Sequence, residues 1–167
     1  MSIELSGGNR ITAGELPLSD KDPLSFTLDK FTFTILSDRL YHPDGLWVME
    51  SGERLLIGVT DFFQQNSGDV AFAEVAEPGT VVAAGERLAN IETIKIDNEL
   101  ASPVSGTVVE VNDKLTFEAE VINQSPYEDG WLAFIAPSAW NRERAGLLSP
   151  EAYLDINIEQ ARREVGK

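Results

Sequence analysis

Residues 90–99 are Asn-Ile-Glu-Thr-Ile-Lys-Ile-Asp-Asn-Glu (NIETIKIDNE), and they place a single lysine, Lys95, among three acidic residues. The nearest other basic residues are Arg87 and Lys114. Many solvated strands carry an isolated lysine, so chance is one explanation. The other explanation is that Lys95 is there to be chemically modified. The residue pattern alone predicts a strand that continues through Lys95 and turns at Asp97-Asn98, because the isoleucines beside the lysine are poor turn residues.

On both sides of this stretch the chain consists of short apolar runs separated by turn residues. Six strands are predicted from these runs, at residues 46–50, 55–59, 70–75, 87–94, 106–111 and 131–135. Many short strands at this spacing predict a mainly β fold, either a barrel or a sandwich. One short helix is expected at 60–68, where Thr60 would be the N-cap and Gly68 suits the left-handed position that ends a helix.

The N-terminal part of the chain differs from this β body. Residues 1–24 are rich in Gly, Ser, Asp and Pro, which predicts a loosely held leader. Residues 31–35 alternate Phe and Ile with Thr, the pattern of a half-buried strand, and Asp29-Lys30 is a candidate turn of a small hairpin. We therefore expect an N-terminal extension, residues 1–38, that is partly disordered or forms a small strand or hairpin. The main domain is expected to span residues 39–167.

The main domain is expected to end in an α-helix at about residues 149–165. Ser149 supplies a capping hydroxyl, Pro150 suits the first turn, and Glu151 lies near the positive end of the helix dipole. An apolar stripe at spacings of three and four predicts that this helix docks on the β body. The stripe consists of Leu154, Ile158, Ala161 and Val165.

A weak internal repeat flanks Lys95. Residues 78–82 (PGTVV) resemble residues 103–109 (PVSGTVV), and the two segments lie nearly evenly on either side of the lysine. Two copies are too few for a solenoid. They suit a quasi-symmetric β sandwich made of two similar halves.

Composition argues against several classes of function. The chain has 167 residues, with 13 basic and 28 acidic residues and a formal net charge of −15. We expect no nucleic-acid or membrane partner, because phosphate binding needs clustered cations. Cysteine is absent and His42 is the one histidine, so we expect no catalytic residues and no metal site. No apolar run has the length of a membrane span and no signal pattern is visible, so the expected location is the cytoplasm, or an organelle matrix after removal of a transit peptide.

The segment 92–95 (ETIK) followed by 102–112 (SPVSGTVVEVN) resembles a lipoyl domain. More narrowly, the chain resembles the glycine cleavage system H-protein family. Further blocks match that family in order: 58–62 (GVTDF), 68–70 (GDV), 126–132 (PYEDGWL) and 137–138 (PS). The resemblance covers roughly residues 39–153. A bare E-x-x-K carries no information, whereas this ordered set of blocks is specific.

The resemblance implies a flattened β barrel, or hybrid sandwich, with Lys95 at the tip of a β-hairpin. It implies lipoic acid joined to Lys95 through an amide, which would supply the sulfurs that the chain itself lacks. Glu92 would help a lipoate ligase or lipoyl transferase to recognise the hairpin. The protein would be a carrier and not an enzyme, shuttling an aminomethyl group among glycine decarboxylase, aminomethyltransferase and dihydrolipoyl dehydrogenase. We expect a monomer.

The chain departs from the family pattern at several positions. Gly45 and Leu46 stand where the family has a His-Glu pair. Ile96 follows the lysine, where a small residue is usual. Phe63 replaces a common alanine, and Glu128 replaces a common glycine. These departures predict a competent acceptor of lipoate that is a less efficient glycine-cleavage partner than an ordinary family member.

Three other functions remain open from the sequence. An H-like lipoate-binding protein would serve sulfur oxidation with a heterodisulfide-reductase-like complex, and the departures above keep this alternative open. A biotinyl carrier shares the fold but usually has methionine on both sides of its lysine, where this chain has Ile94 and Ile96. An unmodified interaction module is disfavoured by the number of matching blocks.

Overall fold

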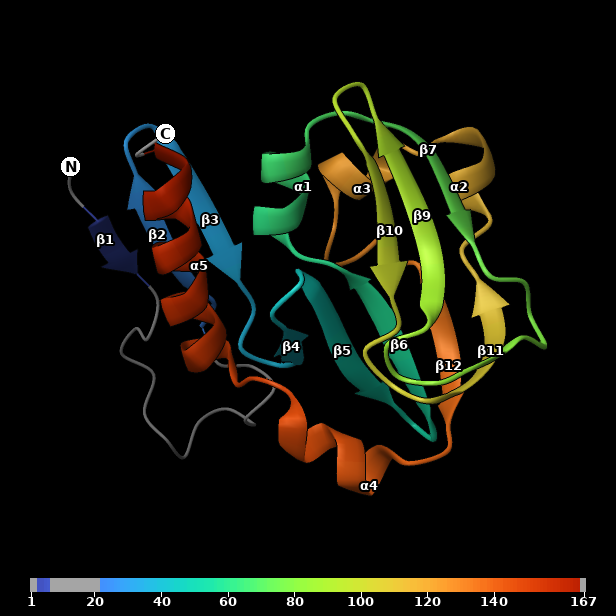
Figure 1. The fold of residues 1–167 in the computed structure, drawn as a ribbon. Coiled ribbons are helices and arrows are strands. Elements are labelled where there is room, and N and C mark those ends of the chain that lie inside the picture. Colours follow the sequence, from blue (N-terminus) through green and yellow to red (C-terminus); the bar gives the residue numbers. More distant parts are fainter. Residues whose placement is uncertain (1–2, 7–21, 166–167) are drawn as a thin grey trace.

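The structure is a computed structural model that describes residues 3–6 and 22–165. Most of the predicted leader therefore lies outside the described residues. The strands form three antiparallel sheets (Figure 1). The largest contains β4 (Leu40–His42), β5 (Leu46–Ser51), β6 (Arg54–Val59), β8 (Val81–Val82), β11 (Gly106–Val111) and β12 (Ala133–Pro137). The second contains β7 (Val70–Val75), β9 (Arg87–Thr93) and β10 (Asp97–Ala101), and the third contains β1 (Ile3–Ser6), β2 (Leu24–Leu28) and β3 (Phe31–Ile35).

The order of strands in the largest sheet is β4-β5-β6-β12-β11-β8, and in the second it is β10-β9-β7. Several short helices and one long one accompany the sheets. They are α1 (Asp61–Ser67), α2 (Lys114–Phe117), α3 (Val121–Gln124), α4 (Trp140–Glu143), the 3₁₀ turn η2 (Arg144–Gly146) and α5 (Pro150–Val165). The expected mainly β sandwich with an internal and a C-terminal helix is confirmed.

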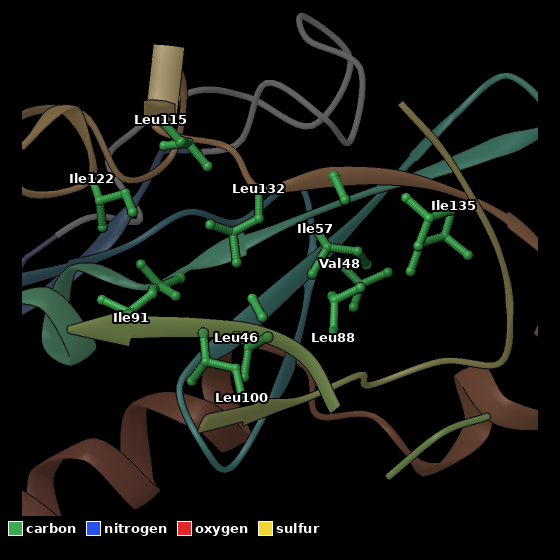
Figure 2. Packing of buried hydrophobic residues seen from close by; sticks show 14 of the residues in the cluster. Leu46, Val48, Ile57, Leu88, Ile91, Leu100, Leu115, Ile122, Leu132 and Ile135 are labelled. Atoms are coloured by element: carbon green, nitrogen blue, oxygen red, sulfur yellow. The ribbon is translucent and has the colours of Figure 1, made fainter. Parts of the chain in front are cut away.

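An aliphatic core lies between the six-stranded sheet and the β10-β9-β7 sheet (Figure 2). Alternation along the strands produces it, because successive side chains of a strand point to opposite faces. In β6, for example, Leu55, Ile57 and Val59 are buried while Leu56 is only partly covered. The other sheet contributes Ile91 to the same core. We call this cluster the aliphatic core.

The strands predicted at 70–75 and 106–111 have those bounds in the structure, and three others agree within one residue. The exception is the strand predicted at 131–135, which begins at Ala133. The Asn112 side-chain amide donates hydrogen bonds to the carbonyls of Asp129 and Trp131, at 2.7 and 2.8 Å. These bonds engage the Trp131 carbonyl outside the sheet, so β12 begins two residues later than predicted.

The two segments of the internal repeat lie side by side. Strand β8 pairs with β11 through Val82 opposite Gly106, and Gly79 N donates to Val108 O at 2.7 Å. Val108 N in turn donates to Thr80 O at 2.8 Å. The repeat therefore forms one edge of the six-stranded sheet, with the Lys95 hairpin between its two copies in the chain.

A second, mostly aromatic core joins the two ends of the chain. Its buried members are Phe26, Leu28, Phe33, Ile35, Tyr41, Trp47, Phe62, Tyr153, Leu154 and Ala161. The β2–β3 hairpin turns at Asp29-Lys30, as the sequence predicts, and Asp29 has a φ of 56°. The helix predicted at 149–165 is confirmed as α5, with Ser149 Oγ accepting from Ala152 N at 3.1 Å. We call this cluster the aromatic core.

The predicted docking of α5 on the β body is right only in part. Helix α5 packs on β2 of the N-terminal hairpin and on β4. Leu154 and Ala161 of the predicted stripe are buried and Ile158 is partly buried, while the Val165 side chain lies outside the described residues. The sequence pattern identifies the buried face of the helix but cannot tell which sheet covers it.

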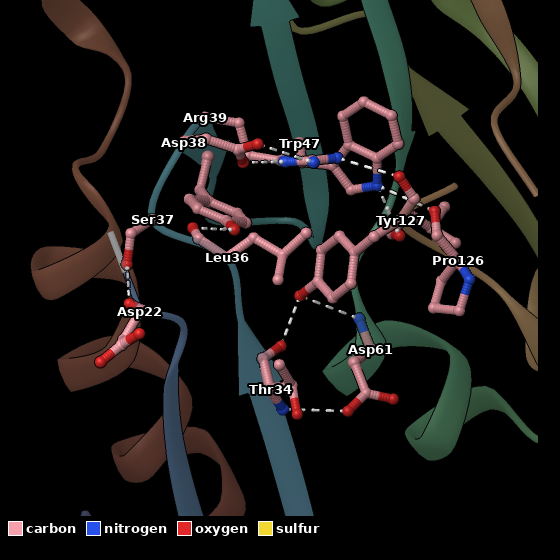
Figure 3. Close-up of polar contacts among 12 residues, drawn as sticks. Asp22, Thr34, Leu36, Ser37, Asp38, Arg39, Trp47, Asp61, Pro126 and Tyr127 are labelled. Carbon is pink, nitrogen blue, oxygen red and sulfur yellow. Dashed lines mark hydrogen bonds and ion pairs between the residues drawn. The ribbon is translucent and has the colours of Figure 1, made fainter. Parts of the chain in front are cut away.

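A polar network ties the N-terminal hairpin to the main domain (Figure 3). The Tyr127 hydroxyl donates to Thr34 O at 2.5 Å and accepts from Asp61 N at 3.3 Å. The Asp61 carboxylate accepts from Thr34 N at 2.9 Å. Burial raises the pKa of Tyr127 well above its ordinary value. The Pro-Tyr-Glu-Asp-Gly-Trp block thus provides the tyrosine that holds residues 22–38 in place.

Candidate functional site

Lys95 lies in the turn of the β9–β10 hairpin. Thr93 N donates to Ile96 O at 2.8 Å, and Thr93 Oγ1 accepts from Ile96 N at 3.1 Å. These bonds close a four-residue turn with Ile94 and Lys95 at its tip. The turn that the residue pattern predicts at Asp97-Asn98 is wrong, because both residues belong to β10 and pair with Glu92 and Ile91.

The register of the hairpin explains this result. Ile91 of β9 and Leu100 of β10 are buried in the aliphatic core. A shift of one residue would move each of them to the solvent face, so the buried face fixes the register. The Thr93 side chain then supplies the hydrogen bonds that a tight turn needs. Long-range packing overrides the poor turn propensity of isoleucine.

The Lys95 side chain is exposed, and its neighbours Ile94 and Ile96 are 84% and 50% exposed. Within the described part of the chain, Lys95 makes no hydrogen bond or ion pair. Its aliphatic stem leans over the C-terminal end of α1, since a Cβ added to Gly68 would lie 3.3 Å from Lys95 Cε. Gly68 ends α1 with a φ of +89° and a ψ of −168°, so its positive φ agrees with the prediction while the left-handed helical conformation expected there is not adopted. The amino group is thus accessible from solvent.

Glu92 lies on the outward face of β9, three residues before Lys95. It is exposed and stands opposite Phe72 of β7 and Asp97 of β10. Among residues 3–6 and 22–165 it forms no ion pair, with Lys95 or with any other residue. Glu92 therefore lies on the same hairpin as the lysine, and no ion pair within the described residues accounts for a carboxylate at this position.

Helix α1 and the partly buried Asn123 side chain support β7 beside the tip of the hairpin, where Val70 pairs with Thr93. Thr60 Oγ1 accepts from Phe63 N at 3.1 Å, which confirms the predicted N-cap of α1. Asn123 donates to Gly68 O at 2.9 Å and accepts from Val70 N at 2.9 Å. Sequence reasoning missed Asn123, because its partners are more than fifty residues away and no local pattern marks it.

Two departures from the family pattern contact one another. Gly45 is buried with a φ of +100°, and a Cβ added there would lie 2.9 Å from Phe63 Cδ2 and 3.0 Å from Phe63 Cβ. A histidine at position 45 has no room beside Phe63. Leu46 is fully buried in the aliphatic core, so it offers no surface to a partner. The glycine at position 45 therefore leaves the space that the Phe63 ring occupies.

His42 has a local role. Its Nδ1 accepts a hydrogen bond from Asp44 N at 3.0 Å in the turn between β4 and β5. Within residues 3–6 and 22–165, no group of three or more His, Asp or Glu side chains is arranged to hold a metal ion. No helix in this part of the chain is both long enough and apolar enough to cross a membrane.

The sandwich and its lysine-tipped hairpin define a lipoyl-carrier type of protein, and comparisons with known proteins agree. A family model described as glycine cleavage H-protein matches residues 39–160. The mitochondrial glycine cleavage system H protein of Pisum sativum is 37% identical over 153 residues, which are 89% of this chain and 92% of the relative. The H protein of Geobacillus thermodenitrificans is 41% identical over 113 residues, 68% of this chain and 88% of the relative.

A crystal structure of an H protein from Mycobacterium marinum is similar as well. It has a TM-score of 0.67 and 31% identity, and the match covers 74% of this chain and 98% of that one. The chain belongs to the glycine cleavage H-protein family. It is a lipoylated carrier of the glycine cleavage system and not an enzyme, and the sulfur-oxidation alternative is not favoured.

Proposed function

We propose that Lys95 is the residue that bears the lipoyl group. The observation that carries this proposal is an exposed lysine in the turn of a hairpin whose register is fixed by the core. Lys95 makes no polar contact within the described residues, so its amino group can be acylated without breaking an interaction. Acylation removes its positive charge, and the attached group supplies the dithiol chemistry that the cysteine-free chain lacks.

The surroundings of Lys95 fit such a group. The glycine at position 68 leaves space for the lysine stem, since a side chain there would contact Cε. Thr93 closes the turn, and Asn123 holds Gly68 and Val70 next to it through the hydrogen bonds described above. A flexible arm on a rigid hairpin can reach several active sites, and its attachment raises the local concentration of the arm at each docked enzyme.

We propose the following partners for this carrier. A lipoate ligase or lipoyl transferase loads Lys95, and Glu92 helps that enzyme to recognise the hairpin. The loaded protein shuttles an aminomethyl group from glycine decarboxylase to aminomethyltransferase, and dihydrolipoyl dehydrogenase reoxidises the arm. We propose the cytoplasm as its location. The relatives in rice and pea are named mitochondrial, whereas the names of the bacterial relatives mention no organelle.

Intact mass spectrometry tests the proposed attachment site. Protein from a lipoate-competent host is expected to carry one lipoyl increment, which Lys95→Ala abolishes. Lys114→Ala is the matched control, because Lys114 is also exposed and is expected to leave the increment in place. A biotin increment, or a lipoyl group on Lys114, would overturn the proposal.

We also propose that the carrier is a less efficient glycine-cleavage partner than family members with the usual His-Glu pair. The support is that Gly45 and Phe63 together leave no space for an imidazole at position 45. Glycine–bicarbonate exchange, reconstituted with fully lipoylated protein and the partner enzymes of the same organism, measures this. Exchange equal to that with an H protein that carries the His-Glu pair, under the same conditions, would contradict it.

A further inference from the structure

A groove runs along the outer face of β7 and β9 beside α2, on the flank of the Lys95 hairpin opposite α1. Its volume is about 550 Å³. Phe72 of β7 and Phe117 of α2 line it and are 69% and 86% exposed. Figure 1 shows α2 next to the β7 edge of the sheet. Two phenyl rings in one groove form an exposed apolar surface of the kind that marks contact sites.

The local structure holds both rings outward. Leu115 and Ala119, on either side of Phe117, are buried in the aliphatic core and anchor this segment. The pairing of β7 with β9 is irregular between Val70 and Phe72, and Phe72 lies opposite Glu92. Both rings are exposed although the segments that carry them are well anchored. The exposure of these rings is built into the fold.

The groove lies close to the proposed attachment site. Phe72 is the cross-strand partner of Glu92, and Glu92 is three residues from Lys95. An enzyme that acts on the dithiolane end of a lipoyl group can bind at a distance from the hairpin equal to the length of the lipoyl-lysine side chain. An enzyme that forms the amide must bring Lys95 Nζ itself into its active site. Only the second kind of enzyme is forced into contact with the surface one strand away.

The charge around the groove defines the chemistry of its partner. Glu74, Glu92 and Glu120 line the groove. Arg87 pairs with Glu74 at 2.9 Å, whereas Glu92 and Glu120 have no ion pair within the described residues. A second copy of the chain, with a net charge of −15, would bring the same acids to this surface and be repelled. A partner with basic residues around an apolar contact is complementary.

We propose that this groove, the Phe72–Phe117 groove, is the docking surface for the enzyme that attaches lipoate to Lys95. This inference rests on the proposed role of Lys95. In the transfer, the neutral Lys95 amine attacks the carbonyl of an activated lipoate, such as an acyl adenylate. The bond between that carbonyl carbon and the phosphate oxygen breaks, the nucleotide leaves, and the nitrogen loses one proton. The groove contributes binding and orientation to this step and no chemistry.

The test uses the unmodified full chain, a purified lipoate ligase, ATP and lipoate. In the Phe72→Ala/Phe117→Ala variant, kcat/KM for the carrier is expected to fall about tenfold or more, since buried aromatic anchors dominate binding energy at interfaces. The Kd between unmodified carrier and ligase, measured by calorimetry, is expected to rise by the same factor. Phe31→Ala is the matched control, because Phe31 is 49% exposed on the N-terminal hairpin, and it is expected to change both values less than twofold.

Two further measurements complete the test. Raising the salt concentration is expected to weaken binding, and Glu92→Gln/Glu120→Gln is expected to reduce that salt dependence. Dihydrolipoyl dehydrogenase is expected to reoxidise the fully lipoylated Phe72→Ala/Phe117→Ala variant at a rate within twofold of wild type. If wild type is lipoylated on Lys95 but the double variant keeps its kcat/KM and Kd, the docking proposal is wrong. If wild type is not lipoylated on Lys95, the proposed function itself fails.

Discussion

The aliphatic core and the aromatic core of this protein hold different parts of the chain by different means. The aliphatic core is made of Leu, Ile, Val and Ala side chains from the two facing sheets and from the segment around α2 and α3, and it belongs to the part of the chain that matches the family. The aromatic core collects Phe, Tyr and Trp from residues 26–62 and joins them to α5. The first core supports the hairpin that presents Lys95. The second fastens the N-terminal hairpin and the C-terminal helix onto it.

The aromatic residues add directional contacts that the aliphatic core lacks. Aliphatic side chains pack without direction, whereas phenol and indole groups need hydrogen-bond partners when they are buried. Tyr41 donates to Leu36 O at 2.6 Å, and Trp47 Nε1 donates to Val59 O at 2.9 Å. The hydroxyls of Tyr153 and Thr60 are 2.8 Å apart. Each bond fixes one element of the aromatic core at a defined position on the carrier body.

Gly58 shows how closely the two cores meet. A Cβ added to Gly58 would lie 2.3–2.7 Å from three atoms of the Trp47 indole. The ring lies against the backbone of β6, on the strand that also supplies Ile57 to the aliphatic core. The glycine of the Gly-Val-Thr-Asp block is therefore required by the indole of the neighbouring strand.

The largest expected losses of stability come from removing a large side chain from either core. Phe26 and Ile57 are both fully buried, one in each core. We expect Phe26→Ala to lower the free energy of unfolding by about 3–5 kcal/mol and Ile57→Ala by about 2–5 kcal/mol, through lost burial and a residual cavity. Urea unfolding followed by tryptophan fluorescence and by circular dichroism measures both.

The two variants also test whether the cores unfold together. If they form one cooperative unit, both probes give the same transition midpoint in each variant. Separate midpoints in Phe26→Ala alone would show that the aromatic core melts first. A loss below about 1 kcal/mol in Phe26→Ala would contradict its place in a packed core.

The next effect is a sensitivity to alkaline pH that only the aromatic core has. All three tyrosines of the chain lie in or against it. Burial raises the pKa of Tyr153 to about 12, from an ordinary value of 10.0. Burial also raises the pKa of Tyr41 well above that value. The folded state keeps the Tyr153 phenol protonated, so its contribution to the free energy of unfolding is fully present below pH 10 and is lost as the pH rises through about 12.

From Tyr153 alone we expect a loss of about 2–3 kcal/mol across that interval. Unfolding free energies at pH 8, 10 and 11 measure the onset of this loss. Tyr153→Phe is expected to be less stable than wild type at pH 8 by about 1 kcal/mol, because the contact with Thr60 is lost. Its stability is expected to decline less steeply above pH 10. An equally steep decline in wild type and variant would contradict the assignment to Tyr153.

A smaller effect is expected where the cores adjoin, at Gly45. Phe63 packs on the aliphatic core and its neighbour Phe62 belongs to the aromatic core. We expect Gly45→Ala to lower the free energy of unfolding by about 1–3 kcal/mol, through a strained positive φ and the contact with Phe63. Gly52→Ala is the matched control, since Gly52 has a φ of +64° and no heavy atom within 4 Å of an added Cβ.

A double-mutant cycle separates the contact from the strain. In a Phe63→Ala background, Gly45→Ala is expected to be less destabilising by at least about 0.5 kcal/mol. Gly52→Ala is expected to have the same effect in both backgrounds. If the cycle gives no coupling, the two departures from the family pattern are independent of one another.

The smallest effect is expected at the tip of the hairpin, which belongs to neither core. Lys95→Ala is expected to change the free energy of unfolding by no more than about 0.5 kcal/mol, as is usual for exposed side chains without specific contacts. The same urea titration measures it on unmodified protein. A loss of several kcal/mol would mean that Lys95 has a structural role.

The sequence by itself determined the elements whose signals are local. Strand alternation, the Thr60 and Ser149 caps and the Asp29-Lys30 turn each depend on a few neighbouring residues, and the structure agrees with them. The ordered blocks around Lys95 identified the family, because many residues in a fixed order rarely match by chance. They also indicated the turn at Lys95, which the turn propensities of its neighbours contradict.

Only the tertiary structure decided how these elements combine. The hairpin turns at Ile94-Lys95 because Ile91 and Leu100 must both reach the aliphatic core. Helix α5 lies on β2, more than a hundred residues away in the chain, and Gly45 has its conformation beside Phe63. Each depends on burial shared between distant segments, and a local pattern shows that a side chain will be buried without showing which segment will cover it.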